Sequence, residues 1–139
     1  MPVQGIFGTS IELLGKTLDL RAKRQTMIAA NLANVETPGY TPTDLSFEGQ
    51  LKSALKDGGR SSGVTNPRHI PLKGRAGALP GVQGDVIEIG SGSMAPDGNG
   101  VEMESEMGRL AENQIMYNAS VQILGKEFEE LKQAIRGTL

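Results

Sequence analysis

The chain has no cysteine and no tryptophan, and it has one histidine among its 139 residues. Without cysteine it can form no disulfide, no thiolate metal site and no cysteine nucleophile. Two tyrosines and three phenylalanines leave little bulky material for a compact core. No apolar run approaches the ~18 residues that a membrane-spanning helix requires. Residues 1–7 carry no basic group ahead of an apolar stretch, so we also expect no cleaved signal peptide.

Neither sign of charge is in large excess, because the chain has 14 Lys and Arg and 16 Asp and Glu, which gives a net charge of −2. Neither a basic stripe nor an acidic tail is present. This balance argues against nucleic acid as the main partner, because nucleic-acid binding needs a concentrated basic surface.

Three motifs resemble sites for chemistry and fail on context. The segment 10–17 (SIELLGKT) lacks the first glycine of a phosphate-binding loop and no buried strand precedes it. The segment 90–95 (GSGSMA) matches a dinucleotide fingerprint, but Pro96 follows where a helix must begin. His69 is a lone histidine without partners for a metal or a triad. We therefore predict no enzyme, no cofactor, no metal and no small-molecule substrate.

Glycine and proline are concentrated in the middle of the chain. Residues 41–100 hold twelve of the 19 glycines and five of the seven prolines, and both residues disfavour regular helix. The composition predicts a tail over 1–9, a helix over 10–36, a loop-rich segment over 37–100, a helix over 101–136 and a tail over 137–139. Within the middle, 84–89 is expected to form a strand and 45–55 a short helix.

The first helix is predicted from its apolar spacing. Ser10 is the expected N-cap, and Pro38 with Gly39 stops the helix. Apolar residues recur at steps typical of one helical face. The expected seam consists of Ile11, Leu14, Leu18, Ile28 and Leu32.

The second helix carries the most regular pattern in the sequence. Ten positions alternate in steps of four and three, and Gln114 is the polar one among them. A seven-residue repeat of this length is typical of a left-handed coiled coil. The seam comprises Met103, Met107, Leu110, Gln114, Tyr117, Val121, Leu124, Phe128, Leu131 and Ile135.

These patterns predict an all-α fold. The long N- and C-terminal helices pair as an antiparallel coiled-coil hairpin, and the Gly- and Pro-rich middle segment is mostly irregular with a short strand. A two-helix hairpin buries too little apolar surface to offset its chain entropy. We therefore expect association with other chains to supply the missing burial.

The segment 30–40 (ANLANVETPGY) resembles the N-terminal signature of the bacterial flagellar rod, hook and hook-associated proteins. The flanking segments 20–25 (LRAKRQ), 44–48 (DLSFE), 101–107 (VEMESEM) and 110–114 (LAENQ) are similar to the proximal rod, FlgB-type branch of that family. Thr41 departs from the family pattern, which commonly has a basic residue there.

The resemblance implies a structural subunit of the flagellar basal-body proximal rod, the periplasm-crossing drive shaft, which assembles helically and is needed for motility. The implied partners are further copies, other rod proteins, the rod-to-ring adaptor, the membrane ring and the flagellar type III export apparatus. The seam residues above form the expected assembly interface.

The resemblance also assigns roles to single residues. The signature residues are Asn31, Asn34, Thr37, Pro38, Gly39 and Tyr40. The two asparagines are expected to cap the end of the first helix, Pro38 and Gly39 to turn the chain, and the Tyr40 ring to pack against the turn. Phe7 and Ile11 fit the spacing of an export-recognition element, consistent with export from the cytoplasm without a cleaved signal.

Two alternatives stay open. One is another short rod component of FlgC type. The other is a non-polymerising helical adaptor or export chaperone, which would fold stably by itself instead of through assembly.

Overall fold

The computed structural model describes residues 8–57, 79–89 and 101–137. They form five elements in the order α1, β1, α2, β2, α3. Their bounds are α1 Thr9–Ala33, β1 Thr43–Ser46, α2 Glu48–Asp57, β2 Asp85–Glu88 and α3 Met103–Arg136.

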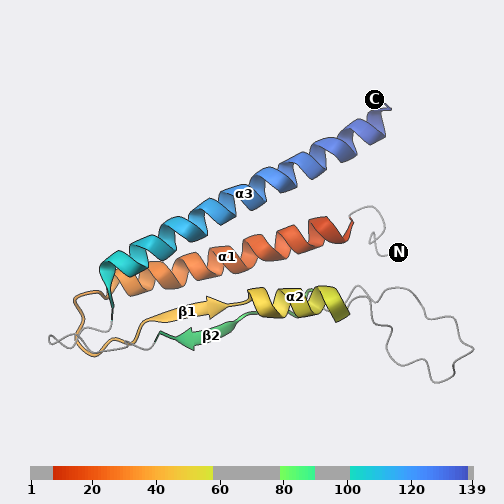
Figure 1. Cartoon of the computed structure of the whole chain (residues 1–139). Helices are drawn as coiled ribbons and strands as arrows, with labels where there is room; N and C mark the ends of the chain where they lie inside the picture. Colours follow the sequence, from red (N-terminus) through yellow and green to blue (C-terminus); the bar gives the residue numbers. More distant parts are fainter. Residues whose placement is uncertain (1–7, 58–78, 90–100, 138–139) are drawn as a thin grey trace, which may run out of the picture.

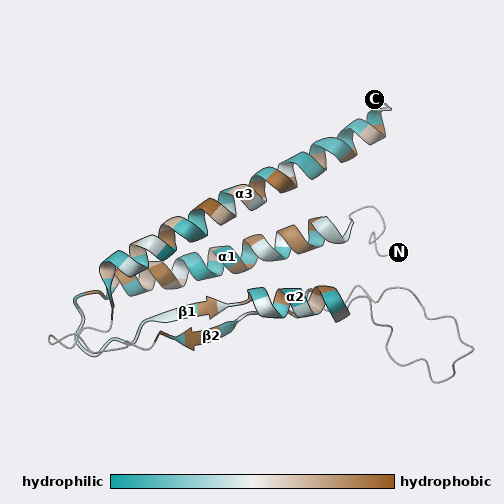
Figure 2. Cartoon of the chain, in the orientation of Figure 1, coloured by the Kyte–Doolittle hydropathy of each residue, from teal (hydrophilic) through white to brown (hydrophobic). Residues whose placement is uncertain are grey.

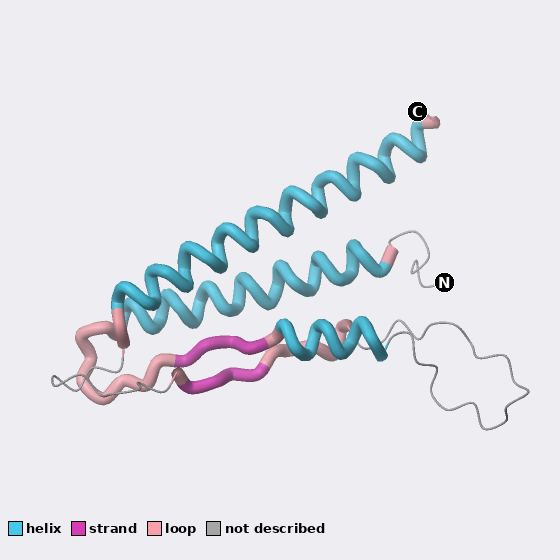
Figure 3. The backbone as a smooth tube through the Cα atoms, viewed as in Figure 1, coloured by secondary structure: helices cyan, strands magenta, loops and turns pink. Residues whose placement is uncertain are grey.

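The elements lie in three layers, with α1 in the middle (Figure 1). On one side α1 packs against α3, which runs antiparallel to it. On the other side lie the β1–β2 pair and α2. Figure 3 shows the loop that leaves the end of α1 and returns the chain as β1. The expected fold class is confirmed, since the long N- and C-terminal helices pack against one another and the middle segment carries short strands.

The ends of α1 differ from the prediction. The helix begins at Thr9 after Gly8, without a side-chain cap, so Ser10 lies inside the first turn. It ends at Ala33 instead of Glu36, because Asn34 donates hydrogen bonds to carbonyl groups of the last turn. The Asn34 amide N–H donates to the carbonyls of Ala30 and Asn31, and its side-chain Nδ2 donates to Ala30 O at 2.8 Å.

Both elements expected in the middle segment, a strand and a short helix, are present. The predicted strand is present as β2, and it pairs antiparallel with β1 in a register that sets Leu45 opposite Val86. The predicted helix over 45–55 is present as α2, but it begins at Glu48 because residues 43–46 are already extended as β1. The sequence pattern had not indicated β1.

The apolar core lies between α1 and the layer of β1, β2 and α2. Its buried residues are Leu20, Leu45, Phe47, Ala54, Leu79 and Val82, with Leu13, Met27 and Leu51 packed against them. The guanidinium of Arg21 covers this core, 5.5 Å from the centre of the Phe47 ring, which is cation–π range. Leu13, Leu20 and Met27 repeat every seven residues, so α1 has a second apolar stripe besides the predicted seam.

None of the helices that the structure describes combines the length and hydropathy needed to cross a membrane.

Candidate assembly site

The side chain of the signature residue Asn31 connects α1 to other elements through a group of hydrogen bonds, which we call the joint around Asn31. Its side chain is fully buried and all of its hydrogen-bonding capacity is used. Nδ2 donates to Thr43 O at 2.8 Å and to Glu106 Oε2 at 2.9 Å, while Oδ1 accepts from Thr43 N at 3.1 Å and from the Tyr40 hydroxyl at 3.2 Å. Asn31 therefore ties α1 to β1 and to α3. It does not cap α1 as predicted, since its bonds go to residues distant in sequence.

The rest of the signature shapes the turn after α1. Asn34 is the C-cap residue, and its Oδ1 accepts from Thr37 Oγ1 at 3.2 Å. Gly39 has a φ of 75°, a left-handed conformation that glycine adopts without a Cβ penalty. Pro38 is exposed at the same turn. Tyr40 is half-buried, and its contribution to the turn is its hydroxyl bond to Asn31 rather than ring packing alone.

The residues that α3 buries are polar. Glu106 and Asn113 are each 2% exposed. Glu106 accepts from Arg109 Nη1 at 2.6 Å in addition to Asn31. Asn113 Nδ2 donates to Arg21 O at 3.0 Å and to Gln25 Oε1 at 2.9 Å. Hydrogen bonds of this kind depend on register, so they fix how α1 and α3 align along their axes.

A charged clamp holds β1 against α1. Arg24 binds Asp44 through two parallel hydrogen bonds, Nε to Oδ1 at 2.7 Å and Nη2 to Oδ2 at 2.6 Å, and its Nη1 reaches Glu48 at 3.2 Å. Burial of Asp44 acts to raise the pKa of its carboxyl. The bonds from Arg24 and from the Leu45 N–H, with the guanidinium charge, outweigh this effect and hold that pKa below its ordinary value. The same pairing raises the pKa of Arg24.

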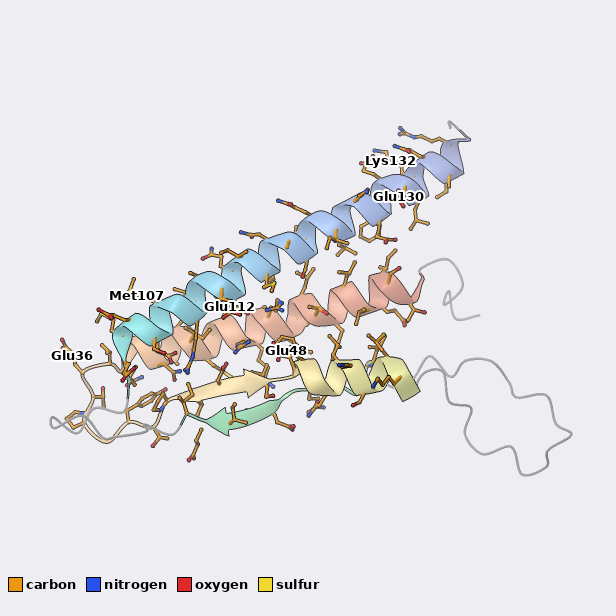
Figure 4. The ribbon with its side chains drawn as sticks, in the orientation of Figure 1. Glu36, Glu48, Met107, Glu112, Glu130 and Lys132 are labelled. Carbon is orange, nitrogen blue, oxygen red and sulfur yellow. The ribbon has the colours of Figure 1, made fainter. Side chains whose placement is uncertain are left out.

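The structure divides the predicted seam of α3 into two rows. Leu110, Leu124 and Leu131 are half-buried, Tyr117 lines a groove between α1 and α3, and Met103 is 50% exposed. The second row is exposed, and its Gln114 also lines that groove. We call it the outer row, and it consists of Met107, Gln114, Val121, Phe128 and Ile135. Figure 4 shows Met107 on the side of α3 that is turned away from α1.

The predicted seam of α1 is partly covered within the chain. Ile28 is fully buried, and Ile11, Leu14, Leu18 and Leu32 are half-buried. Phe7, the other residue of the predicted export element, lies outside the described residues. The interface role of both seams stays a prediction at this point.

A groove of about 300 Å³ opens between α1 and α3 beside the buried Asn113. Its lining residues are Arg21, Ala22, Gln25, Asn113, Gln114, Tyr117 and Asn118. Arg21 Nε, buried at this place, has no hydrogen-bond partner among the described residues. The lining residues are mostly polar in type, but the surface that they present to the groove is mainly apolar.

Sequence reasoning missed the buried polar contacts between α1 and α3. One signal was available: Glu106 and Asn113 are seven residues apart and precede Met107 and Gln114 directly, so they continue the heptad repeat on its inner side. The clamp between Arg24 and Asp44 had no comparable signal, because it depends on where β1 lies in space.

Comparison with known proteins agrees with this architecture. The sequence profile of the family described as flagella basal body rod protein matches residues 11–41, the segment that contains the α1 seam and the signature. The flagellar basal body rod protein FlgB of Salmonella typhimurium strain LT2 is 32% identical over 127 residues, covering 88% of this chain and 89% of that protein.

Two further relatives carry the same name. FlgB of Proteus mirabilis strain HI4320 is 31% identical over 128 residues, covering 87% of this chain and 89% of the relative. FlgB of Borrelia hermsii is 30% identical over 138 residues, covering 94% and 98%. The likeness extends over both helices and the segment between them. The chain belongs to the FlgB family of flagellar basal body rod proteins, and it is a structural subunit of the rod.

Proposed function

We propose that this chain builds the proximal part of the periplasmic rod by helical self-assembly, and that its two long helices form the packing surfaces between subunits. The outer row of α3 carries this proposal. Its apolar members are 56% (Met107), 45% (Val121), 45% (Phe128) and 82% (Ile135) exposed, although their heptad spacing is that of a buried seam.

Exposed apolar residues arranged in one continuous row are uncommon on a protein that works alone. Figure 2 shows that apolar positions recur along α3 far from its contact with the end of α1. The core within the chain is small and lies on the other side of α1. Covering the outer row with another subunit would supply the burial that the single chain lacks.

The proposed partners are further copies of this chain and other rod proteins, with the rod-to-ring adaptor and membrane ring at the proximal end. The joint around Asn31 supports this role. A rod that transmits torque requires each subunit to hold its elements at fixed angles, and these hydrogen bonds hold α1 in place relative to β1 and α3. Glu106 and Arg109 extend that joint into α3.

We also propose that the chain reaches the periplasm through the flagellar type III export apparatus, with Phe7 and Ile11 as recognition residues. Ile11 lies in the first turn of α1 and is half-buried. Export by this route starts from an unassembled chain, which agrees with a subunit whose stability depends on assembly.

The test is to find where the chain resides. Basal bodies purified from cells that produce a tagged copy in place of the native one should contain it in the rod fraction, and cells lacking the chain should form basal bodies without rods and should not swim. Recovery of the chain as a stable soluble complex in the cytoplasm, with none in basal bodies, would instead establish the adaptor or chaperone alternative.

A further inference from the structure

The groove between α1 and α3 holds a cationic side chain whose hydrogen bonds are incomplete. Of the described residues that line the groove, Arg21 is the only charged one. Its Nη1 donates to Asn113 Oδ1 at 3.5 Å, the outer limit of a hydrogen bond, and its buried Nε has no partner in the described part of the chain. A buried N–H without an acceptor destabilises a fold. The groove therefore lacks an acceptor for this guanidinium.

The groove also indicates which acceptor fits it. A carboxylate binds a guanidinium through two parallel hydrogen bonds, and none of the residues that line the groove carries one. The groove has a volume of about 300 Å³, whereas one water occupies about 30 Å³ of liquid. Its surface is mainly apolar, which suits the methylene groups of an acidic side chain better than it suits a hydrated ion. The best match is a glutamate side chain.

The last two turns of α3 extend past the beginning of α1. The hydrogen bond from Asn113 to Gln25 aligns these two antiparallel helices. Thr9, the first residue of α1, precedes Gln25 by 16 residues, so it lies level with the position 16 residues after Asn113, which is Glu129. We call residues 129–136 the overhang, because this part of α3 has no residue of α1 beside it.

The overhang carries a carboxylate that is free to bind another chain. Of its two glutamates, Glu129 accepts from Lys132 Nζ at 3.5 Å. Glu130 is exposed and has no ionic partner among the described residues. Figure 4 shows Glu130 close to the C-terminal end of α3. It lies about 25 Å along the helix from Asn113, so it cannot reach the groove of its own chain.

We propose that the Glu130 carboxylate of one copy enters the groove of the next copy and binds the Arg21 guanidinium. The carboxylate completes the hydrogen bonds of the guanidinium, and the Glu130 methylene groups cover the apolar surface of the groove. The two copies are then displaced along their helix axes by about 20 Å, the axial distance between Arg21 and Glu130 within one chain. The proposal rests on the rod function above and names a contact through which copies meet.

A second copy is the partner that this arrangement favours. The groove and the overhang occur together in every copy and carry opposite charges, so each copy can bind one neighbour at its groove and another at its overhang. A contact between unlike surfaces leaves one of each free at the ends of a growing series, so it can repeat as an open helix. The proposed contact therefore permits a rod to elongate, which a closed pair would not.

Thiol cross-linking tests the contact, because the native chain has no cysteine. Cells produce a full-length chain with Ala22→Cys and Ala134→Cys in place of the native chain. Ala22 lines the groove and is exposed, and Ala134 lies one turn beyond Glu130 on the same face of α3. Both substitutions leave Arg21 and Glu130 intact. Within one chain the two cysteines are roughly 30 Å apart along the axis, which is beyond the reach of a short bismaleimide.

Purified basal bodies treated with this reagent should give dimers, trimers and longer species of the double variant, and monomers of each single variant. Lys132→Cys, combined with Ala22→Cys, is the matched control. Lys132 is exposed and lies two residues from both Glu130 and Ala134, so it is on the opposite side of α3. The control should give less than a tenth of the cross-linked species.

Charge reversal gives an independent test. Glu130→Arg alters an exposed residue, so the purified chain should keep its unfolding midpoint while the soft-agar swimming diameter falls at least threefold. Arg21→Glu should also reduce swimming, although it removes the contact with the Phe47 ring as well. The two residues are too far apart to interact within one chain. Recovery of half or more of the native diameter when both charges are reversed would therefore demonstrate a contact between copies.

Other results would overturn the contact. Native swimming of cells with Glu130→Arg, at native protein levels, would show that the groove holds water alone. Dimers of the Ala134→Cys single variant would establish that two overhangs meet, and cross-linking of Ala22→Cys to a different rod protein would assign the groove to that protein. Each of these outcomes removes the proposed contact and leaves the rod function standing. Swimming of cells that lack the chain would instead remove the function.

Discussion

Asn31 of α1 donates a buried hydrogen bond of 2.9 Å to the carboxylate of Glu106 in α3, across a separation of 75 residues in the sequence. The same amide group donates to Thr43 O, so one side chain joins three elements. Its position within the family signature gives that signature a physical role. The segment both ends the first helix and holds the two outer layers of the molecule in a fixed relation to it.

Replacing Asn31 by alanine is expected to lower the free energy of unfolding by about 2–4 kcal/mol, because buried groups of Thr43 and Glu106 would lose their partner. Asn31→Asp should be at least as damaging, since it sets a second carboxylate beside Glu106. Urea unfolding of the purified chain, followed by circular dichroism, measures both effects.

Gln122→Ala serves as the control for these variants, because Gln122 is exposed on α3 and its loss should change the free energy of unfolding by less than about 0.5 kcal/mol. Equal stability of Asn31→Ala and Gln122→Ala would show that the joint around Asn31 contributes little to the fold.

Much of this fold can be predicted from the sequence. The long helices follow from apolar residues at steps of three and four, and the strand β2 from a short β-branched run between glycines. The joint around Asn31 cannot be predicted in this way, because Asn31 and Glu106 become neighbours only when α3 returns along α1. The family resemblance led us to expect a helix cap at Asn31, whereas its side chain bonds to residues distant in sequence. The strand β1 was missed because Asp44 and Leu45 are both buried, which removes the usual polar and apolar alternation.

The division of the α3 seam into two rows is a second feature that the sequence alone could not predict. Periodicity identified a seam of nine apolar positions and Gln114, but it could not say which of them are covered within the chain. Leu124 is half-buried and Val121 is exposed, although they are three residues apart. That distinction depends on the rotation of α3 about its axis, which the buried amide of Asn113 sets.

The Arg24–Asp44 clamp should make stability depend on pH at the acid end. The pKa of Asp44 is lower in the folded state than the value of about 3.9 for an unfolded chain. Its contribution is therefore complete above pH ~4 and is lost as the pH falls through the folded-state pKa. Asp44→Asn should be less stable than the native chain by about 2 kcal/mol at pH 7.

Thermal unfolding between pH 2 and pH 7 measures this dependence. The native chain should lose more stability than Asp44→Asn over the acid range, so the two curves should converge. Lys52→Gln, which alters an exposed residue of α2, should leave the acid profile unchanged. Parallel curves for the native chain and Asp44→Asn would contradict the clamp.

Gly84→Ala should be destabilising for two separate reasons. Gly84 has a φ of +73°, and a Cβ there would lie 2.9 Å from Leu45 Cγ in the core. Gly39 has a φ of +75° with no atom within 4 Å of a Cβ, so Gly39→Ala carries the backbone cost of about 1 kcal/mol alone. We expect Gly84→Ala to cost about 1–3 kcal/mol more. Chemical denaturation of both variants measures the difference, and equal losses would show that Leu45 moves aside freely.

Charged substitutions in the two rows of α3 should separate folding from assembly. Leu124→Asp places a carboxylate at a half-buried position of α3, so we expect it to destabilise the isolated chain by about 2–4 kcal/mol and to abolish swimming. Val121→Asp alters a residue that is 45% exposed, so the isolated chain should keep its stability within about 0.5 kcal/mol while swimming is still lost. Ala119→Asp, on another exposed face of α3, should preserve both. Soft-agar motility, compared with unfolding curves of the same variants, provides the measurement. Normal swimming of cells with Val121→Asp, at native protein levels, would show that the outer row is not buried between subunits.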